Sequence, residues 1–191
     1  DGTLIMNQRF EDGAILTLPD FPEHERLIGE TWSCPVEIIN NTVIVDRDLI
    51  IGPIYNTKSG GTEFDVILNE VSGLVVSFYG IGKPTSVDWG DGTITNPPNS
   101  SSVGHTYSSY GKYTIIAYGI THIGGSIFNG QETSTSSGYN AIQNTILVEA
   151  RLHNEITSIS ATSMTGTNSR RGFSYHYNLK AISLPNSLKT I

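Results

Sequence analysis

The chain has 191 residues, of which 37% are hydrophobic and 15% are charged. This length suits one large domain or two small ones, and it excludes both a peptide and a large multidomain enzyme. Eleven Lys and Arg residues against 18 Asp and Glu residues give a formal net charge of -7. Such a charge repels a phosphate backbone, so we expect no nucleic-acid partner.

The low charge content, together with many Ile, Thr, Ser and Asn residues, favours strands joined by polar turns over surface helices. The charge is uneven: residues 1–100 hold 15 acids and 5 bases, and residues 101–191 hold 3 acids and 6 bases. This split indicates separate modules. Cys34 is the single cysteine of the chain, which excludes an intrachain disulfide. One cysteine also provides too few thiolate ligands to favour a structural zinc site. The sequence shows no leader peptide and no run of 18 apolar residues, so it predicts no membrane span.

Residues 1–60 are expected to form a β-hairpin module. Asp12-Gly13 and Asn40-Asn41 are turn sequences, because Gly and Asn accept the left-handed conformations that tight turns require. The flanking apolar runs predict strands at 3–6, 14–18, 36–39, 42–45 and 49–51. The Gly- and Ser-containing run at 57–62 has the composition of a flexible linker.

Residues 62–123 have the strand spacing of a β-sandwich. The expected strands cover residues 64–68, 74–81, 86–89, 93–95 and 113–118. Successive side chains of a strand point to opposite faces, so Leu74, Val76 and Phe78 share one face. By the same rule, alternate residues from Tyr113 to Ala117 share one face of the last strand, and these two faces are candidate walls of one core.

A sequence motif points to a particular kind of sandwich. The segments Trp89-Gly90-Asp91-Gly92-Thr93, His105-Thr106-Tyr107 and Gly111-Lys112-Tyr113-Thr114 occur in this order. Together they resemble the PKD family of immunoglobulin-like domains, and the resemblance covers about residues 62 to 120. It implies a β-sandwich whose structural core residues are Trp89, Asp91, Gly92, Tyr107 and Tyr113.

Two kinds of chemistry can be weighed at this motif. Asp88 and Asp91 are hard oxygen ligands, but calcium needs six to eight oxygens and no calcium-loop pattern follows. We therefore expect Asp91 to accept backbone N–H groups within its turn. His105 with Ser101 and Ser102 suggests a catalytic triad, but no nucleophile elbow accompanies them. The sequence predicts no catalytic, cofactor-binding or metal-binding residue, and no enzyme.

Residues 124–144 are polar and Gly-rich and are expected to form a surface loop. Beyond them, residues 147–159 align without a gap on residues 179–191, at an offset of 32. Identical residues stand at four positions: Leu147 and Leu179, Leu152 and Leu184, Asn154 and Asn186, and Ile159 and Ile191.

Residues 145–191 resemble the BspA-like leucine-rich repeats of bacterial surface proteins and some phage tail proteins. The run from Phe173 to Ile191 is the specific part of the resemblance. The first copy departs from the pattern, with His153 in place of Pro and Met164 in place of an aromatic residue. The resemblance implies a partial solenoid. Such repeats bury their apolar faces only against neighbours, so the chain is expected to be the stem of a longer protein.

The run Tyr175-His176-Tyr177 is a candidate ligand-binding platform, because aromatic rings stack on sugars; a packing turn is the alternative. Arg170-Arg171 is expected to be a solvated pair. The resemblances imply a mainly β, non-catalytic adhesion or recognition protein, extracellular or on a cell or virion surface. Its expected partners are a host-cell or surface protein or a glycan, or further copies of the chain. The alternatives are an accessory module of a secreted polymer-degrading enzyme and a structural subunit of a phage tail or fibre.

Overall fold

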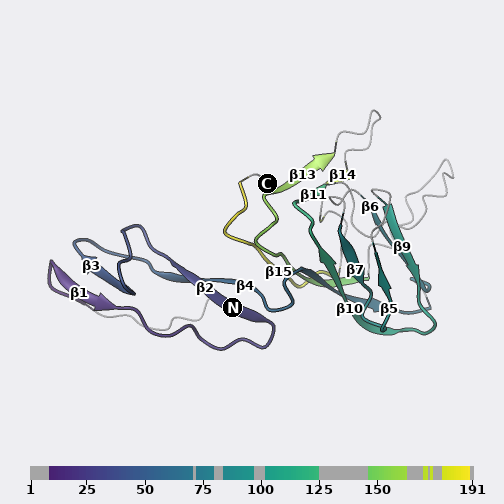
Figure 1. The fold of residues 1–191 in the computed structure, drawn as a ribbon, viewed down its shortest axis with the longest axis horizontal. Helices are drawn as coiled ribbons and strands as arrows, with labels where there is room; N and C mark the ends of the chain where they lie inside the picture. The colour runs from purple at the N-terminus through teal and green to yellow at the C-terminus, as the bar shows by residue number, and fades with distance from the viewer. Residues whose placement is uncertain are drawn as a thin grey trace. The chain divides into compact units, whose positions relative to one another are not determined.

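The chain is mainly β in a computed structural model that describes residues 9–70, 72–79, 84–96, 102–124, 146–162, 170–171, 173 and 178–189. These residues form strands and turns, and no helix occurs among them. The chain divides into two compact units, Asp1–Tyr55 and Asn56–Ile191. Figure 1 shows the strands of each unit. The strand predicted at 3–6 and most of the loop predicted at 124–144 lie outside the described residues.

The N-terminal unit contains two pairs of strands. β1 (Ala14–Thr17) pairs antiparallel with β3 (Thr42–Val45), and β2 (Leu27–Ser33) pairs with β4 (Gly52–Thr57). Leu18, Trp32 and Val43 are the buried centre of this unit. So few buried residues make a small core, and two-stranded sheets gain little stability by themselves.

The turn predicted at Asn40-Asn41 is confirmed. Both residues have positive φ, 49° and 60°, and Ile39 and Thr42 on either side bridge each other. The strands predicted at 36–39 and 49–51 are wrong apart from that bridge at Ile39, and Ile50 is 91% exposed. Apolar side chains in short runs suggested strands, but strand pairing depends on a neighbouring edge that sequence alone does not identify.

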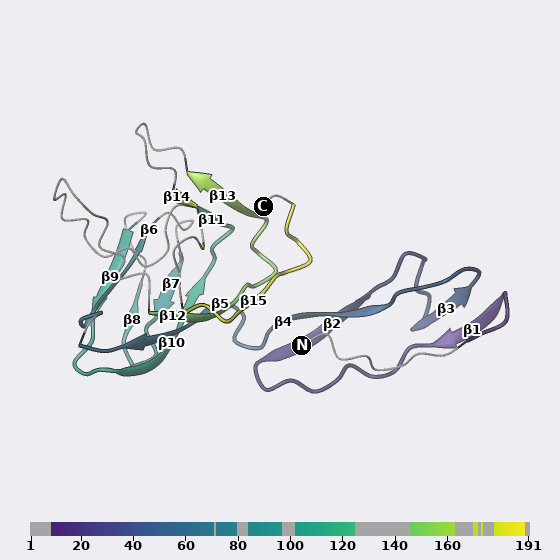
Figure 2. The same ribbon diagram turned by 180° about the vertical axis from the view of Figure 1, so that it is seen from behind.

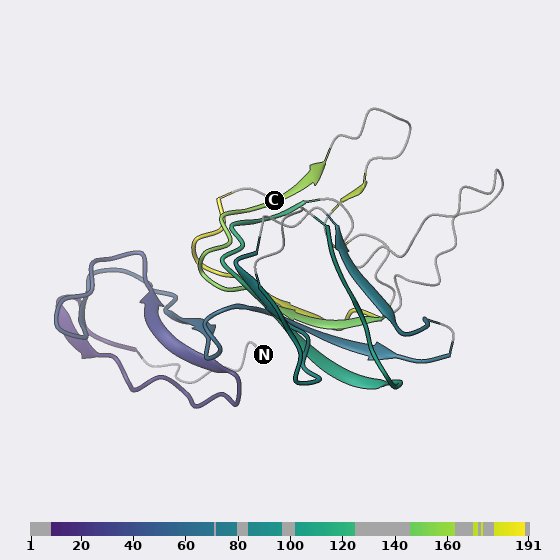
Figure 3. The ribbon, with the colours of Figure 1, turned by 45° about the vertical axis from the view of Figure 1, so that its right-hand side comes forward.

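The second unit is built on a six-stranded sheet in the order β15-β12-β5-β10-β7-β8. Its strands are β5 (Thr62–Leu68), β7 (Ser86–Asp88), β8 (Ile94–Thr95), β10 (Gly111–Tyr118), β12 (Leu147–Arg151) and β15 (Ala181–Ser183). A second pair, β6 (Val75–Tyr79) with β9 (Ser102–Thr106), lies across the core from this sheet (Figure 3). A third sheet joins β11 (His122–Gly124), β13 (Ser158–Thr162) and β14 (Arg170–Arg171).

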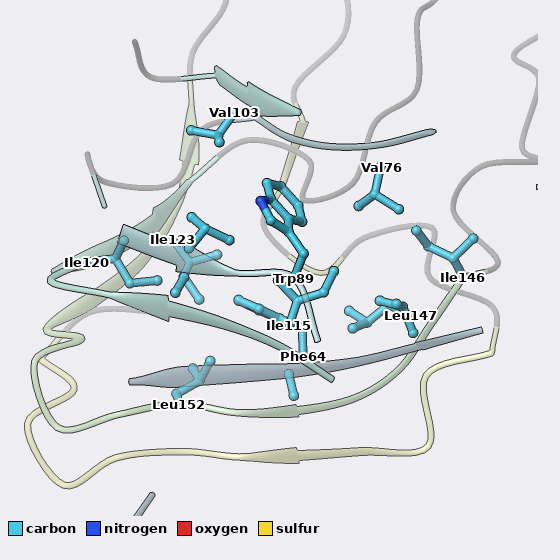
Figure 4. Close-up of a cluster of buried hydrophobic side chains, with 14 of the residues drawn as sticks. Phe64, Val76, Trp89, Val103, Ile115, Ile120, Ile123, Ile146, Leu147 and Leu152 are labelled. Carbon is cyan, nitrogen blue, oxygen red and sulfur yellow. The ribbon is translucent and has the colours of Figure 1, made fainter. Parts of the chain in front are cut away.

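The core of this unit lies between the six-stranded sheet and the β6–β9 pair. Figure 4 shows Trp89 in the middle, with Phe64 and Ile115 on one side and Val76 and Val103 on the other. Trp89, Phe64 and Ile115 are fully buried. The predicted burial of Trp89 is therefore confirmed, and its indole N–H donates to Thr95 Oγ1 at 2.9 Å.

Most strands predicted in this region are present, with shifted ends. The alternation predicted for β10 is confirmed, since Ile115 and Ala117 are fully buried and Tyr113 packs against the same core. Val76 is buried while its neighbour Val75 is exposed, as the predicted alternation requires. Strand β9 was not predicted, because Ser102–Thr106 carries a single strongly apolar residue.

The two copies of the repeat pair with each other in register. Strands β12 and β15 are parallel, and the partners Glu149↔Ala181, Ala150↔Ile182 and Arg151↔Ser183 all keep the offset of 32 found in the sequence. The N–H of Lys180 donates to the carbonyl of Val148 at 2.8 Å. Figure 2 shows β12, β5 and β15 side by side from behind.

These copies do not form a solenoid with a core of its own among the described residues. Leu147, Ala150, Leu152 and Ile156 belong to the same hydrophobic cluster as Trp89. The physical reason is that β12 completes the sheet at the free edge of β5, so the apolar face of the first copy is covered by the sandwich. The partial solenoid expected from the sequence is thus observed only as two in-register strands that extend the sandwich sheet.

The predicted linker at 57–62 is wrong, because this segment is an ordered turn between β4 and β5. Thr57 and Thr62 are buried, and the Thr57 hydroxyl donates to the carbonyl of Gly61 at 2.8 Å. A side chain on Gly61 would collide with Ile116 and Tyr118, so a small residue is required there. The unit boundary falls between Tyr55 and Asn56, ahead of the predicted linker.

Trp89→Ala tests the central position of the indole. Deleting a fully buried aromatic side chain costs roughly 3 to 5 kcal/mol of unfolding free energy, and we expect a loss in that range in a urea denaturation experiment. Tyr110, about half exposed, provides the matched control: Tyr110→Ala should change stability by less than about 0.5 kcal/mol. A loss below about 1 kcal/mol for Trp89→Ala would contradict its central packing role.

Candidate functional site

The turn after β7 holds a small polar cluster built around Asp91. Its Oδ1 accepts the backbone N–H of Thr93 at 3.0 Å and the hydroxyl of Thr93 at 2.6 Å, and its Oδ2 lies 2.7 Å from Nε2 of His105. Asp88 Oδ1 accepts the N–H of Gly90 at 2.9 Å. The predicted role of Asp91, accepting a backbone N–H within its turn, is confirmed.

Gly90 and Gly92 allow this turn to form. Both have positive φ, 75° and 91°, in the range that favours glycine. Gly92 faces open space, whereas a Cβ on Gly90 would collide with the backbone carbonyl of Thr114. The close approach fixes the turn against β10, and this places Asp91 opposite His105 on β9.

Hydrogen bonding determines the ionisation of this cluster. Burial alone would raise the pKa of Asp91, but the hydrogen bonds from Thr93 and His105 outweigh it and lower the pKa from 3.8 to about 2. Asp91 is therefore a carboxylate near neutral pH. Burial, together with the charge of Asp91, raises the pKa of Tyr107 and keeps its phenol protonated.

Aromatic rings connect this polar cluster to the core. The ring of His105 stacks on Trp89, with centroids 5.0 Å apart and planes at 20°. Tyr107 meets the edge of His105 at 4.6 Å and lies 4.2 Å from Tyr113. The Tyr107 hydroxyl donates to the carbonyl of Trp89 at 2.8 Å. Of the residues expected in the core, Trp89 and Tyr107 are fully buried and Tyr113 packs against them, whereas Asp91 and Gly92 are exposed turn residues and not part of the core.

This arrangement bears on the two chemistries weighed from the sequence. Asp88 and Asp91 both bond to turn N–H groups, and no group of three His, Cys, Asp or Glu side chains placed to hold a metal ion occurs in the part of the chain that the structure describes. His105 pairs with Asp91, as in a triad, but Ser101 and the side chain of Ser102 lie outside the described residues. The His–Asp pair packs on Trp89 and ties β9 to the turn.

A second charged cluster, which sequence reasoning missed, surrounds Arg151 on β12. Its Nε lies 2.8 Å from Glu63 Oε2, one Nη lies 2.8 Å from Asp65 Oδ1, and the other lies 2.9 Å from Glu149 Oε1. Arg151 is 2% exposed and Glu63 is 4% exposed. Asp65 also accepts the hydroxyl of Thr114 at 2.7 Å. The guanidinium therefore bridges two neighbouring strands on the face of the sheet opposite the core.

Burial would lower the pKa of Arg151, but the hydrogen bonds that its guanidinium donates to Asp65 and Glu63 outweigh burial and raise that pKa. The cation is thus permanent. A signal for this cluster was present in the sequence: Arg151 interrupts the apolar register of the first copy, and Glu63 and Asp65 alternate with buried Phe64. What the sequence lacked was the pairing of β5 with β12, two strands about 80 residues apart.

The repeat end of the sheet has an open edge. β15 pairs with β12 on one side and is the last strand in the sheet order of the described residues. Leu184 just beyond it is 52% exposed, while Pro185 is buried. The candidate ligand-binding residues Tyr175, His176 and Tyr177 lie outside the described residues, as do the side chains of Arg170 and Arg171.

Comparisons of this chain with family models, with curated proteins and with solved structures each found no match. Among the described residues, no helix is long and apolar enough to cross a membrane.

Asp91→Asn tests the electrostatics of the turn. Because the folded-state pKa of Asp91, about 2, lies below its ordinary value of 3.8, the carboxylate stabilises the fold above that value. Its contribution is lost as the pH falls through the folded-state pKa. The difference in unfolding free energy between wild type and Asp91→Asn should therefore be constant near neutral pH and shrink as the pH falls from 3.8 to about 2.

Thr93→Val is the matched variant, because it removes the hydroxyl that donates to the same carboxylate. Thr93→Val should raise the folded-state pKa of Asp91. The stabilisation by the Asp91 carboxylate should then be lost over a narrower pH range. Urea denaturation at a series of pH values measures both effects. If the difference in unfolding free energy between wild type and Asp91→Asn does not change between pH 3.8 and about pH 2, the lowered pKa of Asp91 is contradicted.

Proposed function

We propose that the chain is a non-catalytic recognition or adhesion protein that acts outside the cell or on a virion, with the sandwich serving as a rigid base for a repeat surface. The observation that carries the proposal is the continuous sheet from the PKD-like motif into the repeat. β10, β5, β12 and β15 are consecutive strands of one sheet, and one hydrophobic core underlies them. A base of this kind fixes the orientation of the ligand-binding side chains that the repeat carries.

The buried core of the sandwich continues beneath the first copy of the repeat. Trp89, Phe64 and Ile115 are fully buried beneath β5 and β10, and the first copy adds Leu147 and Ala150 to the same core. Rigid elements hold binding groups more accurately than loops do. The exposed end of the repeat, near Leu184, is thus a suitable place for contact with a surface protein or glycan.

The aromatic run at 175–177 is the proposed contact with ligand, since aromatic faces stack on pyranose rings. A glycan array and a whole-cell binding assay with the intact chain test this function. We expect specific binding that is lost in the Tyr175→Ala/His176→Ala/Tyr177→Ala variant and kept in Tyr110→Ala, a control at an exposed aromatic residue of the sandwich. Absence of binding by the wild-type chain to any glycan or cell surface would contradict the proposal.

A second candidate function, a structural subunit of an assembly such as a phage tail or fibre, is favoured by the N-terminal unit. Ile15 and Ile44 stand directly opposite each other on β1 and β3, and they are 72% and 59% exposed. Ile28 and Ile39 are also more than half exposed. Several exposed large aliphatic residues on a unit with a small core are typical of a protein–protein contact.

Light scattering over a range of concentrations tests the assembly function. If the exposed isoleucines join copies of the chain, the mass should rise with concentration, and Ile15→Lys/Ile44→Lys should remain monomeric because charges oppose burial of this surface. Val75→Lys, an exposed aliphatic position on β6, is the matched control and should assemble like wild type. A wild-type mass that stays monomeric at all concentrations would exclude self-assembly through this surface.

A further inference from the structure

Strand β5 is the meeting point of the sandwich and the repeat. It pairs with β10 along one edge, from Leu68↔Gly111 to Thr62↔Ala117, and with β12 along the other, where Phe64 lies opposite Ala150. The N–H of Ile67 also donates to the carbonyl of Ile146 at 2.9 Å. The first copy of the repeat therefore occupies the β5 edge, and among the described strands β15 of the second copy pairs with β12 of the first.

The leucines that the two copies share do not explain why the first copy takes this place. Leu147 and Leu179 are identical, as are Leu152 and Leu184, so both copies offer the same leucines in the same register. The copies differ on the core face in the size of one apolar residue, Ala150 against Ile182, and they differ in charge on the opposite face of the strand. The first copy has Arg151 where the second has Ser183.

The β5 edge supplies the partners that an arginine requires. Glu63 and Asp65 both reach the guanidinium of Arg151 at 2.8 Å, from two different positions of β5. Arg presents several N–H donors in a fixed planar arrangement, so it can satisfy two carboxylates at once. Glu149 closes the third side at 2.9 Å. The cation and Glu63 are both almost fully buried.

A strand with serine at this position would leave Glu63 buried without its cation. Removing one partner of a buried ion pair is strongly destabilising because it leaves an unpaired buried charge, whereas the complete pair contributes little net stability. The Arg151 cluster would therefore penalise docking of a strand that lacks the arginine. Strand β15 has no charged residue at the two equivalent positions, because Ala181 and Ser183 stand there in place of Glu149 and Arg151.

From this arrangement we infer that the edge of β5 is an acceptor for an arginine-bearing strand, and that Arg151 is the residue that makes the first copy, and not the second, the strand that docks there. Arg151 is a positioning residue in this assignment. It acts through Glu63 and Asp65, which pair with the strand at the position where the first copy has a cation and the second copy has serine.

Amide hydrogen exchange on the intact chain tests the inference, because two amides report directly on docking. The N–H of Ile67 bonds to Ile146, and the N–H of His153 bonds to the Thr62 hydroxyl at 3.1 Å. Arg151→Ser gives the first copy the residue of the second. Exchange at both amides should become at least ~10-fold faster, since loss of one partner of a buried ion pair is strongly destabilising. The matched control Lys112→Ser, at an exposed cation of β10, should leave both rates unchanged.

The same substitution in the Glu63→Gln/Asp65→Asn background separates recognition from simple packing. If the carboxylates of Glu63 and Asp65 recognise Arg151, its removal should accelerate amide exchange much less in that background than in wild type. Should Arg151→Ser fail to fold, Arg151→Lys is compared in both backgrounds instead, because lysine keeps the charge and loses the planar arrangement of donors. Equal acceleration in the two backgrounds, or rates for Arg151→Ser like those of wild type, would overturn the inference.

Discussion

Pairing at both edges of β5 is the constraint on which the second unit depends. Phe64 on this strand is opposite Ile115 of β10 on one side and Ala150 of β12 on the other, and all three are fully buried. Removing either neighbour would expose apolar surface and unpaired backbone groups together. The sandwich and the first repeat copy therefore depend on a common strand, which is why they share one hydrophobic core.

A second ladder of hydrogen bonds connects the same parts at the corner of the sheet. The carbonyl of Thr121 accepts the N–H of Thr157 at 2.9 Å, and the carbonyl of Thr157 accepts the N–H of Lys189 at 2.8 Å. β11 and β13 continue this contact in parallel, with Ile123 opposite Ile159. The segment after β10 thus accepts a backbone hydrogen bond from the first copy. The first copy accepts an equivalent hydrogen bond from the second copy.

The sequence predicted those features that depend on local chemistry. Asn40-Asn41 formed its turn because these two residues tolerate positive φ, and Trp89 is buried because a large ring beside a tight turn needs a core. The repeat offset of 32 became the register of β12 and β15 because equivalent residues of two copies stack on each other. Each of these predictions needed only neighbouring residues or a direct comparison of two segments.

Features that depend on distant pairing were not predictable. The Arg151 cluster requires β5 and β12 to meet, and nothing in either segment alone identifies the other. The turn at 57–62 has the composition of a linker, and only the tight approach of Gly61 to Ile116 shows why it is ordered. The proposed PKD-like and leucine-rich-repeat relationships remain predictions, since motifs identify residues and not their partners.

The two copies of the repeat differ in burial because they differ in the number of neighbours. The first copy lies between β5 and the second copy, and Leu152 and Ile156 are almost fully buried. Their counterparts Leu184 and Leu188 have a neighbour on one side only; Leu184 is 52% exposed and Leu188 is partly buried. Burial of apolar area is the main source of stability, and the first copy gains it from the sandwich core as well as from the second copy. Local stability within the repeat should therefore decrease from the first copy to the second.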